Sequence, residues 1–106
     1  MALGVRGAYK QTVGNRVGDI ESIANGSAMT IQPASGITWI IEMISYGGAC
    51  TISFTDGTLS DTIDTPTGAG VIEKASYRID HDNYITVTNT SGATATFGYA
   101  GYIVNE

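Results

Sequence analysis

Short strand-like segments follow one another from residue 37 to the end of the chain, and glycine-rich turns separate them. The runs 37–45, 50–54 and 84–88 are rich in Ile, Thr and Val, which favour extended backbone. Turn signals such as Asp56-Gly57 stand between them. This spacing predicts an all-β fold, namely a single antiparallel β-sandwich or jelly-roll-like barrel of about eight strands.

The chain of 106 residues divides into a basic segment and an acidic body. Residues 1–17 contain Arg6, Lys10 and Arg16 and no acidic residue, whereas residues 18–106 contain all ten acidic residues against two basic ones. In residues 1–17 the hydrophobic side chains also recur at no regular spacing. We expect an extended basic N-terminal arm over residues 1–17, with a disordered terminus as the alternative, and a β-sandwich over residues 18–106.

The composition restricts the classes of function. A net charge of −5 argues against nucleic-acid binding, which requires a basic face. Charged residues make up only 14% of the chain, which indicates that part of the surface is covered by another chain. The sequence shows no apolar stretch typical of a signal peptide or a membrane helix, so we expect synthesis in a cytosol, with the chain kept or assembled there.

The segment from Ile37 to Ser45 is apolar on both faces. Strict alternation places Ile37, Trp39, Ile41 and Met43 on one face and Thr38, Ile40, Glu42 and Ile44 on the other. Burial on both sides indicates either a central strand whose outer face is covered or a contact between protomers. We predict the contact, with Ile40 and Ile44 in an oligomer interface. In the preceding segment, residues 19–23, both Ile20 and Ile23 are expected to be buried.

Candidate ligands and catalytic groups are few. The run from Asp80 to Asn83 could offer oxygen ligands to calcium, but it lacks the glycine and the terminal glutamate of an EF-hand loop. A polar turn explains the same residues. His81 is the only histidine, so a zinc site or a catalytic triad would have to include it, and a surface turn is the simpler interpretation.

Other reactive side chains have structural explanations. Asp61 and Asp64 could be a glycosidase pair, but acidic residues on an edge strand also prevent sheet-to-sheet pairing. Trp39 and Cys50 fall on apolar faces and are expected in the core, where the lone cysteine would be inert. We therefore predict a protein that is not an enzyme, with no catalytic residue, no metal and no cofactor.

A set of turn-flanked strands carries a resemblance to a known group of proteins. These segments are residues 36–41, 46–48, 56–58, 84–92 and 97–99. Together they resemble the small β-sandwich virion proteins of tailed bacteriophages, which serve as capsid decoration (cement) subunits or as modules of spikes and fibres. The resemblance extends over residues 18–104.

The resemblance implies a structural role. The expected function is that of a decoration subunit on the exterior of the phage capsid, which bridges shell subunits, with the major capsid protein as partner and a homotrimer as the oligomeric state. The alternative is a receptor- or glycan-binding module of a virion spike or fibre. In the first case the arm, through Arg6, Lys10 and Arg16, is expected to bind the shell, or else to lie across a neighbouring protomer.

Overall fold

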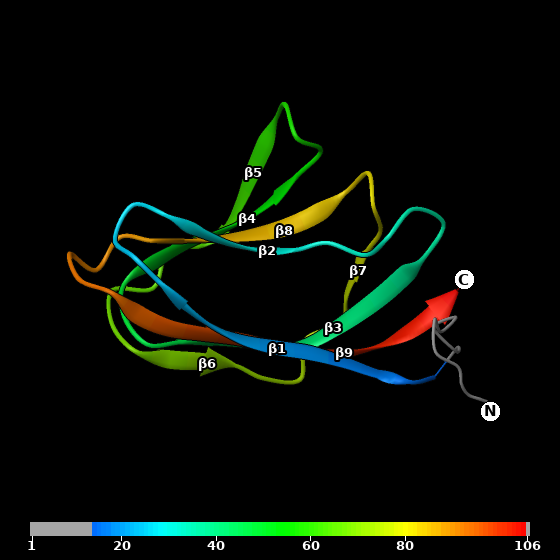
Figure 1. Ribbon diagram of the computed structural model, residues 1–106, viewed down its shortest axis with the longest axis horizontal. Helices are drawn as coiled ribbons and strands as arrows, with labels where there is room; N and C mark the ends of the chain where they lie inside the picture. Colours follow the sequence, from blue (N-terminus) through cyan, green and yellow to red (C-terminus); the bar gives the residue numbers. More distant parts are fainter. Residues whose placement is uncertain (1–13, 106) are drawn as a thin grey trace.

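A computed structural model describes residues 14–105, which form two antiparallel β-sheets packed face to face (Figure 1). The predicted all-β sandwich is confirmed, with nine strands in place of the expected eight or so. Within residues 14–105 there is no helix of the length and hydrophobicity needed to cross a membrane.

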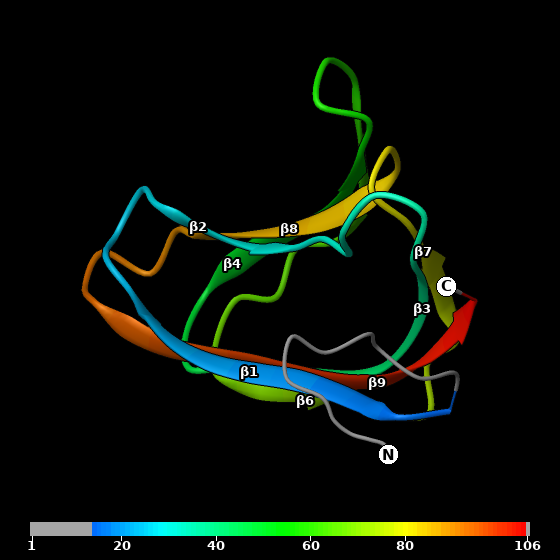
Figure 2. The same ribbon diagram turned by 45° about the vertical axis from the view of Figure 1, so that its right-hand side comes forward.

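The two sheets differ in strand number. The five-stranded sheet has the order β1-β9-β3-β6, and β7 also pairs with β3. The four-stranded sheet has the order β2-β8-β4-β5. The strands are β1 (Arg16–Ile23), β2 (Ala28–Ile31), β3 (Thr38–Tyr46), β4 (Cys50–Thr55), β5 (Ser60–Asp64), β6 (Gly70–Ile72), β7 (Tyr77–Ile79), β8 (Tyr84–Asn89) and β9 (Ala95–Asn105). Figure 2 shows the turn between β4 and β5 rising away from the five-stranded sheet.

The core lies between the sheets and consists mainly of aliphatic side chains, with Trp39 and Phe97 among them. Thirteen residues form one buried cluster: Ile23, Met29, Ile31, Trp39, Ile41, Ile44, Cys50, Ile52, Ile79, Ile85, Val87, Phe97 and Ile103. The four-stranded sheet contributes alternate residues of β2, β4 and β8, as expected when one face of an antiparallel sheet is buried. They are Met29, Ile31, Cys50, Ile52, Ile85 and Val87. Trp39 stacks on Tyr99 of β9, with 6.2 Å between the ring centroids.

A β-bulge interrupts β3. Ile41 pairs with Gly101 and Met43 pairs with Ala100, so Glu42 is an extra residue with no partner of its own in β9. A side chain on Gly101 would collide with the backbone carbonyl of Ile40, which explains why the residue facing the bulge is glycine. The bulge moves every residue after it to the opposite face of the sheet.

The same bulge accounts for the ninth strand. On the other side of β3, residues 70–79 form two short strands, β6 and β7, and not one continuous strand. At the break, Lys74 has a positive φ of 57°, and the Ala75 N–H donates to the Glu42 carbonyl at 2.9 Å. Glu73, which interrupts the apolar alternation of this segment, marks the break in the sequence.

Two asparagines join the turns at one end of the sandwich. Asn89 is fully buried, and its side-chain amide donates to the carbonyls of Ile23 and Ala93, each at 2.8 Å. Asn25 accepts a hydrogen bond from the Gly92 N–H at 2.9 Å. Since a buried amide without partners would be destabilising, these bonds fix the β1–β2 and β8–β9 connections to each other.

Candidate functional site

The two residues predicted for an oligomer interface lie in different environments. Ile44 is fully buried (0% exposed) in the core cluster, because the bulge at Glu42 turns it inward. Ile40 precedes the bulge and keeps its predicted place on the outer face, yet it is only 9% exposed. The face predicted for Ile44 is therefore wrong. The prediction that the two residues contact another protomer is not tested by a single chain.

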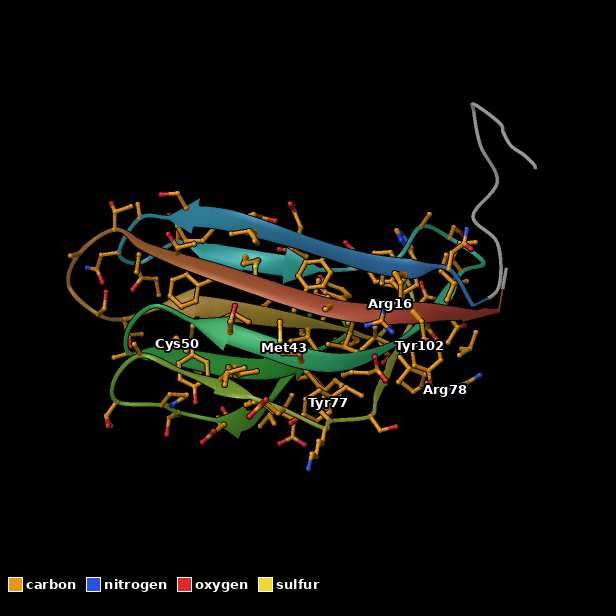
Figure 3. All side chains as sticks on the ribbon, turned by 90° about the horizontal axis from the view of Figure 1, so that it is seen from below. Arg16, Met43, Cys50, Tyr77, Arg78 and Tyr102 are labelled. Atoms are coloured by element: carbon orange, nitrogen blue, oxygen red, sulfur yellow. The ribbon has the colours of Figure 1, made fainter. Side chains whose placement is uncertain are left out.

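A shallow apolar groove lies on the outer face of the five-stranded sheet. We call it the outer groove; its residues are Gly18, Asp19 and Ile20 of β1, Gly98, Tyr99 and Ala100 of β9, and Met43 and Ser45 of β3. Its volume is about 550 Å³. Met43 occupies this face because the bulge reverses its predicted inward direction. Figure 3 looks onto this face and shows Met43 near its centre.

Ile20 forms one wall of the outer groove and is 76% exposed. The expectation that both Ile20 and Ile23 are buried is wrong for Ile20. Residues three apart in a strand point to opposite faces, so only one of the two can enter the core. The structure buries Ile23 and leaves Ile20 in solvent.

Beside the outer groove, cationic and aromatic side chains cross the same face in one row. The register aligns Arg16 of β1, Tyr102 of β9, Ile40 of β3 and Arg78 of β7, which we call the cationic row. Figure 3 shows three of these residues, Arg16, Tyr102 and Arg78, across the sheet at one end. Arg16 donates from Nη1 to Oε1 of Glu42 at 2.9 Å, and Arg78 has no ion pair among the described residues.

The opposite side of the molecule carries an acidic projection. We define the acidic hairpin as residues 54–64, which contain Asp56, Asp61 and Asp64 and no Lys or Arg. Leu59 at its turn is 74% exposed. A cleft of about 290 Å³ lies against its turn, lined by Phe54, Leu59, Asp61 and Asn83 among others.

Hydrogen bonds hold the turn of the acidic hairpin in one conformation. Oδ1 of Asp56 accepts from the N–H groups of Thr58 and Leu59, each at 2.8 Å. The Leu59 N–H bond and then the Thr58 N–H bond hold the pKa of the Asp56 carboxyl below its usual value. Thr55 Oγ1 donates to the Leu59 carbonyl at 2.9 Å. Leu59 is therefore presented on an ordered turn.

The edge strand β1 carries two carboxyls two residues apart, Asp19 and Glu21. Burial and, secondarily, a hydrogen bond to Asp19 raise the pKa of Glu21. Tyr99 in the neighbouring strand has a raised pKa because of burial and then the negative charges of the two carboxyls. Charged residues at an open sheet edge oppose pairing with another strand, which is their simplest use here.

The residues considered as ligands or catalytic groups serve the fold. Asp80 Oδ1 accepts from the N–H groups of Asp82 and Asn83, each at 2.9 Å, as a polar turn requires. His81 Nδ1 lies 3.1 Å from the Pro33 carbonyl. Asp61 and Asp64 lie on β5, the edge strand of its sheet. Across residues 14–105 no three His, Cys, Asp or Glu side chains gather in a way that could hold a metal ion.

Cys50 lies in the core, as its apolar face predicts, and is 1% exposed. Burial, and then the negative charge of Asp64, raises the pKa of its thiol to about 11. Both effects disfavour the thiolate, which is the form that reacts.

The predicted arm lies mostly outside the described residues, and this includes Arg6 and Lys10. Arg16, the third residue predicted to bind a partner, begins β1 and pairs with Tyr102 across the sheet. The last two positions of the segment 1–17 thus belong to the sheet, and the role of the arm stays a prediction.

A comparison with protein families and a comparison with curated proteins each find no match to this sequence. Among solved structures, the fold is similar to that of a chain of the Bacillus endospore appendages, which form a novel family of disulfide-linked pili. The two sequences are 19% identical, the alignment covers 98% of this chain and 99% of the other, and the TM-score is 0.48. At these values the similarity transfers no functional residue and no partner.

The match nevertheless corrects the predicted resemblance to bacteriophage virion proteins. The chain that this fold resembles over almost its whole length belongs to a spore appendage and not to a virion. The predictions that followed from this resemblance are wrong as well. They are the decoration or spike function, the capsid-shell partner, the trimer and the location on the capsid exterior. The physical reason is that short strands and glycine-rich turns are required by any small sandwich, so they do not identify one group of proteins.

Proposed function

We propose that this chain is a non-enzymatic structural subunit that assembles with copies of itself into a non-covalent, pilus-like fibre. The observation that carries this proposal is the outer groove. It is apolar and lies on a sheet face that no other element of residues 14–105 covers (Figure 3). Apolar surface of this kind on a small domain is typical of an interaction site.

Two side chains of the outer groove, Ile20 and Met43, are large enough to form the centre of a subunit interface. Ile20 and Met43 rise beside a floor of Gly18, Gly98 and Ala100, so a partner can approach the backbone closely. Fully burying a side chain such as Ile or Met contributes roughly 1.5–3 kcal/mol. Two such side chains can therefore supply a substantial part of a subunit contact.

Support for a non-enzymatic role comes from what the polar side chains already do. The carboxylates of Asp56 and Asp80 bind backbone N–H groups of their own turns. The side chain of Asn89 makes its hydrogen bonds to backbone groups of Ile23, Ala93 and Ser91, in or beside the β1–β2 and β8–β9 connections. These groups stabilise loops and are not directed at a shared point where a substrate could react.

The fibre would be held together without disulfides. Cys50 is the single cysteine of the sequence, and its sulfur lies in the core with a thiol pKa raised to about 11. A cross-link through Cys50 would require the sandwich to open. In this respect the proposed fibre differs from the disulfide-linked Bacillus pili.

The basic segment offers a second contact. We propose that residues 1–13 of the predicted arm lie across a neighbouring copy, where Arg6 and Lys10 would meet the acidic body of residues 18–106. Ordering the segment costs roughly 1 kcal/mol or more per residue, so several contacts must form together. The division into an arm and a sandwich is part of this proposal.

The experiment is to concentrate the purified full chain and measure its mass by sedimentation while imaging it by negative-stain electron microscopy. We expect a series of species that grows with concentration and filaments at the highest concentrations, both unchanged by a reducing agent. A chain that sediments as a monomer at about 100 μM would refute the proposal. Disassembly by the reducing agent would refute its non-covalent character.

A further inference from the structure

The outer groove and the acidic hairpin have complementary chemistry. The hairpin presents Leu59, an exposed apolar side chain, together with Asp56, Asp61 and Asp64. The groove presents an apolar trough next to the cationic row, which includes Arg16 and Arg78. One surface projects from the molecule and the other is a depression.

Charge distribution separates the two surfaces further. The described residues contain three Lys or Arg side chains, of which Arg16, paired with Glu42, and Arg78 lie in the cationic row. The acidic hairpin has no basic residue. Opposite charges on two patches of the same chain favour contact between unlike patches of two copies.

We propose that the acidic hairpin of one copy docks in the outer groove of the next copy. Leu59 enters the groove between Ile20 and Met43, and the carboxylate of Asp61 faces the cationic row. This contact rests on the proposed homopolymer and specifies which two surfaces build it.

The ordered turn makes Leu59 suitable for this contact. The Asp56 carboxylate and the Thr55 hydroxyl already fix the backbone from Gly57 to Leu59. Docking therefore does not have to order the turn, which removes a cost that a mobile loop would add.

The positions of the two surfaces determine the symmetry of the assembly. Figures 1 and 2 show the β4–β5 turn on the side of the sandwich away from the five-stranded sheet, whose outer face carries the groove. One copy can thus use both surfaces at once, each with a different neighbour. A contact between unlike patches generates a ring if the rotation between neighbours closes and an open chain if it does not, and patches on opposite sides favour the open chain.

A symmetric groove-to-groove dimer is the competing arrangement. A two-fold axis parallel to the strands would bring the cationic row of one copy close to that of the other, and Arg78 has no ion pair within residues 14–105 to offset this repulsion. The acidic hairpin removes the conflict because it supplies the opposite charge. The structure therefore favours the hairpin as the occupant.

Two variants that each remove one surface test the proposal. Leu59→Asp disables the hairpin, and Ile20→Asp disables the groove; both positions are largely exposed, so the fold should persist. Thr30→Asp adds the same charge at an exposed position of β2 and serves as the control. Circular dichroism and thermal melting verify that all three variants are folded. Association is then measured by sedimentation, for each protein alone and for an equimolar mixture of the first two.

We expect each single variant to remain monomeric, with an association constant lowered roughly thirtyfold or more, the loss typical of a central interface residue. Their mixture should form 1:1 dimers and nothing longer, because only the Leu59→Asp groove and the Ile20→Asp hairpin remain intact. Thr30→Asp should assemble like the natural chain. Rising salt should weaken assembly of the natural chain by screening.

Other outcomes are decisive as well. If the natural chain polymerises and Leu59→Asp does so equally well, the hairpin is not the occupant, although the homopolymer stands. A mixture that stays monomeric also refutes the unlike-patch contact. If the natural chain itself is monomeric, the homopolymer and this contact are both wrong.

Discussion

The two outer faces of the sandwich are built from different residues, although the sheets share one core. The outer face of the four-stranded sheet is a ladder of hydroxyls, in which Thr51 pairs with Thr88 and Thr86 lies between Thr30 and Ser53. The outer face of the five-stranded sheet carries the outer groove and the cationic row. Threonine suits a solvated strand, whereas an apolar trough beside charges suits a partner. The contrast teaches that, of the two outer faces, the one on the five-stranded sheet carries the chemistry for assembly.

The largest expected effect concerns the boundary between core and outer face. Ile44→Asp should unfold the domain, because it places a carboxylate at a fully buried position, whereas Met43→Asp, one residue earlier, should leave a folded protein. A loss of more than about 4 kcal/mol is expected for Ile44→Asp. Chemical denaturation monitored by tryptophan fluorescence measures both. Comparable stability of the two variants would show that the bulge does not reverse the faces.

The second prediction compares the two outer faces directly. Met43→Asp and Thr30→Asp each add one carboxylate, the first in the outer groove and the second on the hydroxyl ladder. We expect Met43→Asp to lower the association constant roughly tenfold or more. Thr30→Asp should change it little. Sedimentation of both at the same concentrations measures the difference, and equal effects would remove the distinction between the faces.

A third, smaller effect is expected from the arm. Deleting residues 1–13 keeps β1 and its ion pair between Arg16 and Glu42, so the domain should fold. Assembly should weaken, and its salt dependence should become shallower, because Arg6 and Lys10 are lost. Light scattering over a salt series measures this. Unchanged assembly would mean that the arm makes no contact with a neighbouring copy.

The smallest effect is expected from the core thiol. Because the pKa of Cys50 is raised to about 11, an unfolded chain with an ordinary thiol loses its proton at lower pH than the folded chain. Stability is therefore retained below about pH 9 and is lost as the pH rises toward 11. Melting temperatures of the natural chain and of Cys50→Ala measure this contribution. If the two show the same slope between pH 8 and 11, the thiol does not contribute.

The fold could be predicted from the sequence because alternation and turns are local signals. Segments such as 28–31 and 84–88 bury every second residue, as their pattern indicates. The groove could not be predicted, because it depends on the bulge. Alternation through Glu42 gives no sign that Met43 and Ile44 exchange faces, and Gly101, the residue that permits the bulge, lies sixty positions away.

One part of the site could have been found in the sequence. Ile20 and Ile23 cannot both enter the core from one regular strand, since they are three residues apart. From this spacing, one of the two isoleucines of β1 must be exposed. The pairing of β1 with β9, which brings Ile20 next to Gly98, comes only from the three-dimensional structure.

The single extra residue at Glu42 also determines how this protein can vary. Removing one codon there would delete the bulge, and Ile41, Met43 and Ile44 would then alternate regularly, with Met43 still outward and Ile44 still inward. The same deletion would remove the acceptor for Ala75 and the ionic partner of Arg16. The core and the groove would thus keep their residues, whereas the β6–β7 connection and the start of β1 would lose a contact. Relatives that lack the extra residue should therefore keep the groove and differ in the β6–β7 connection.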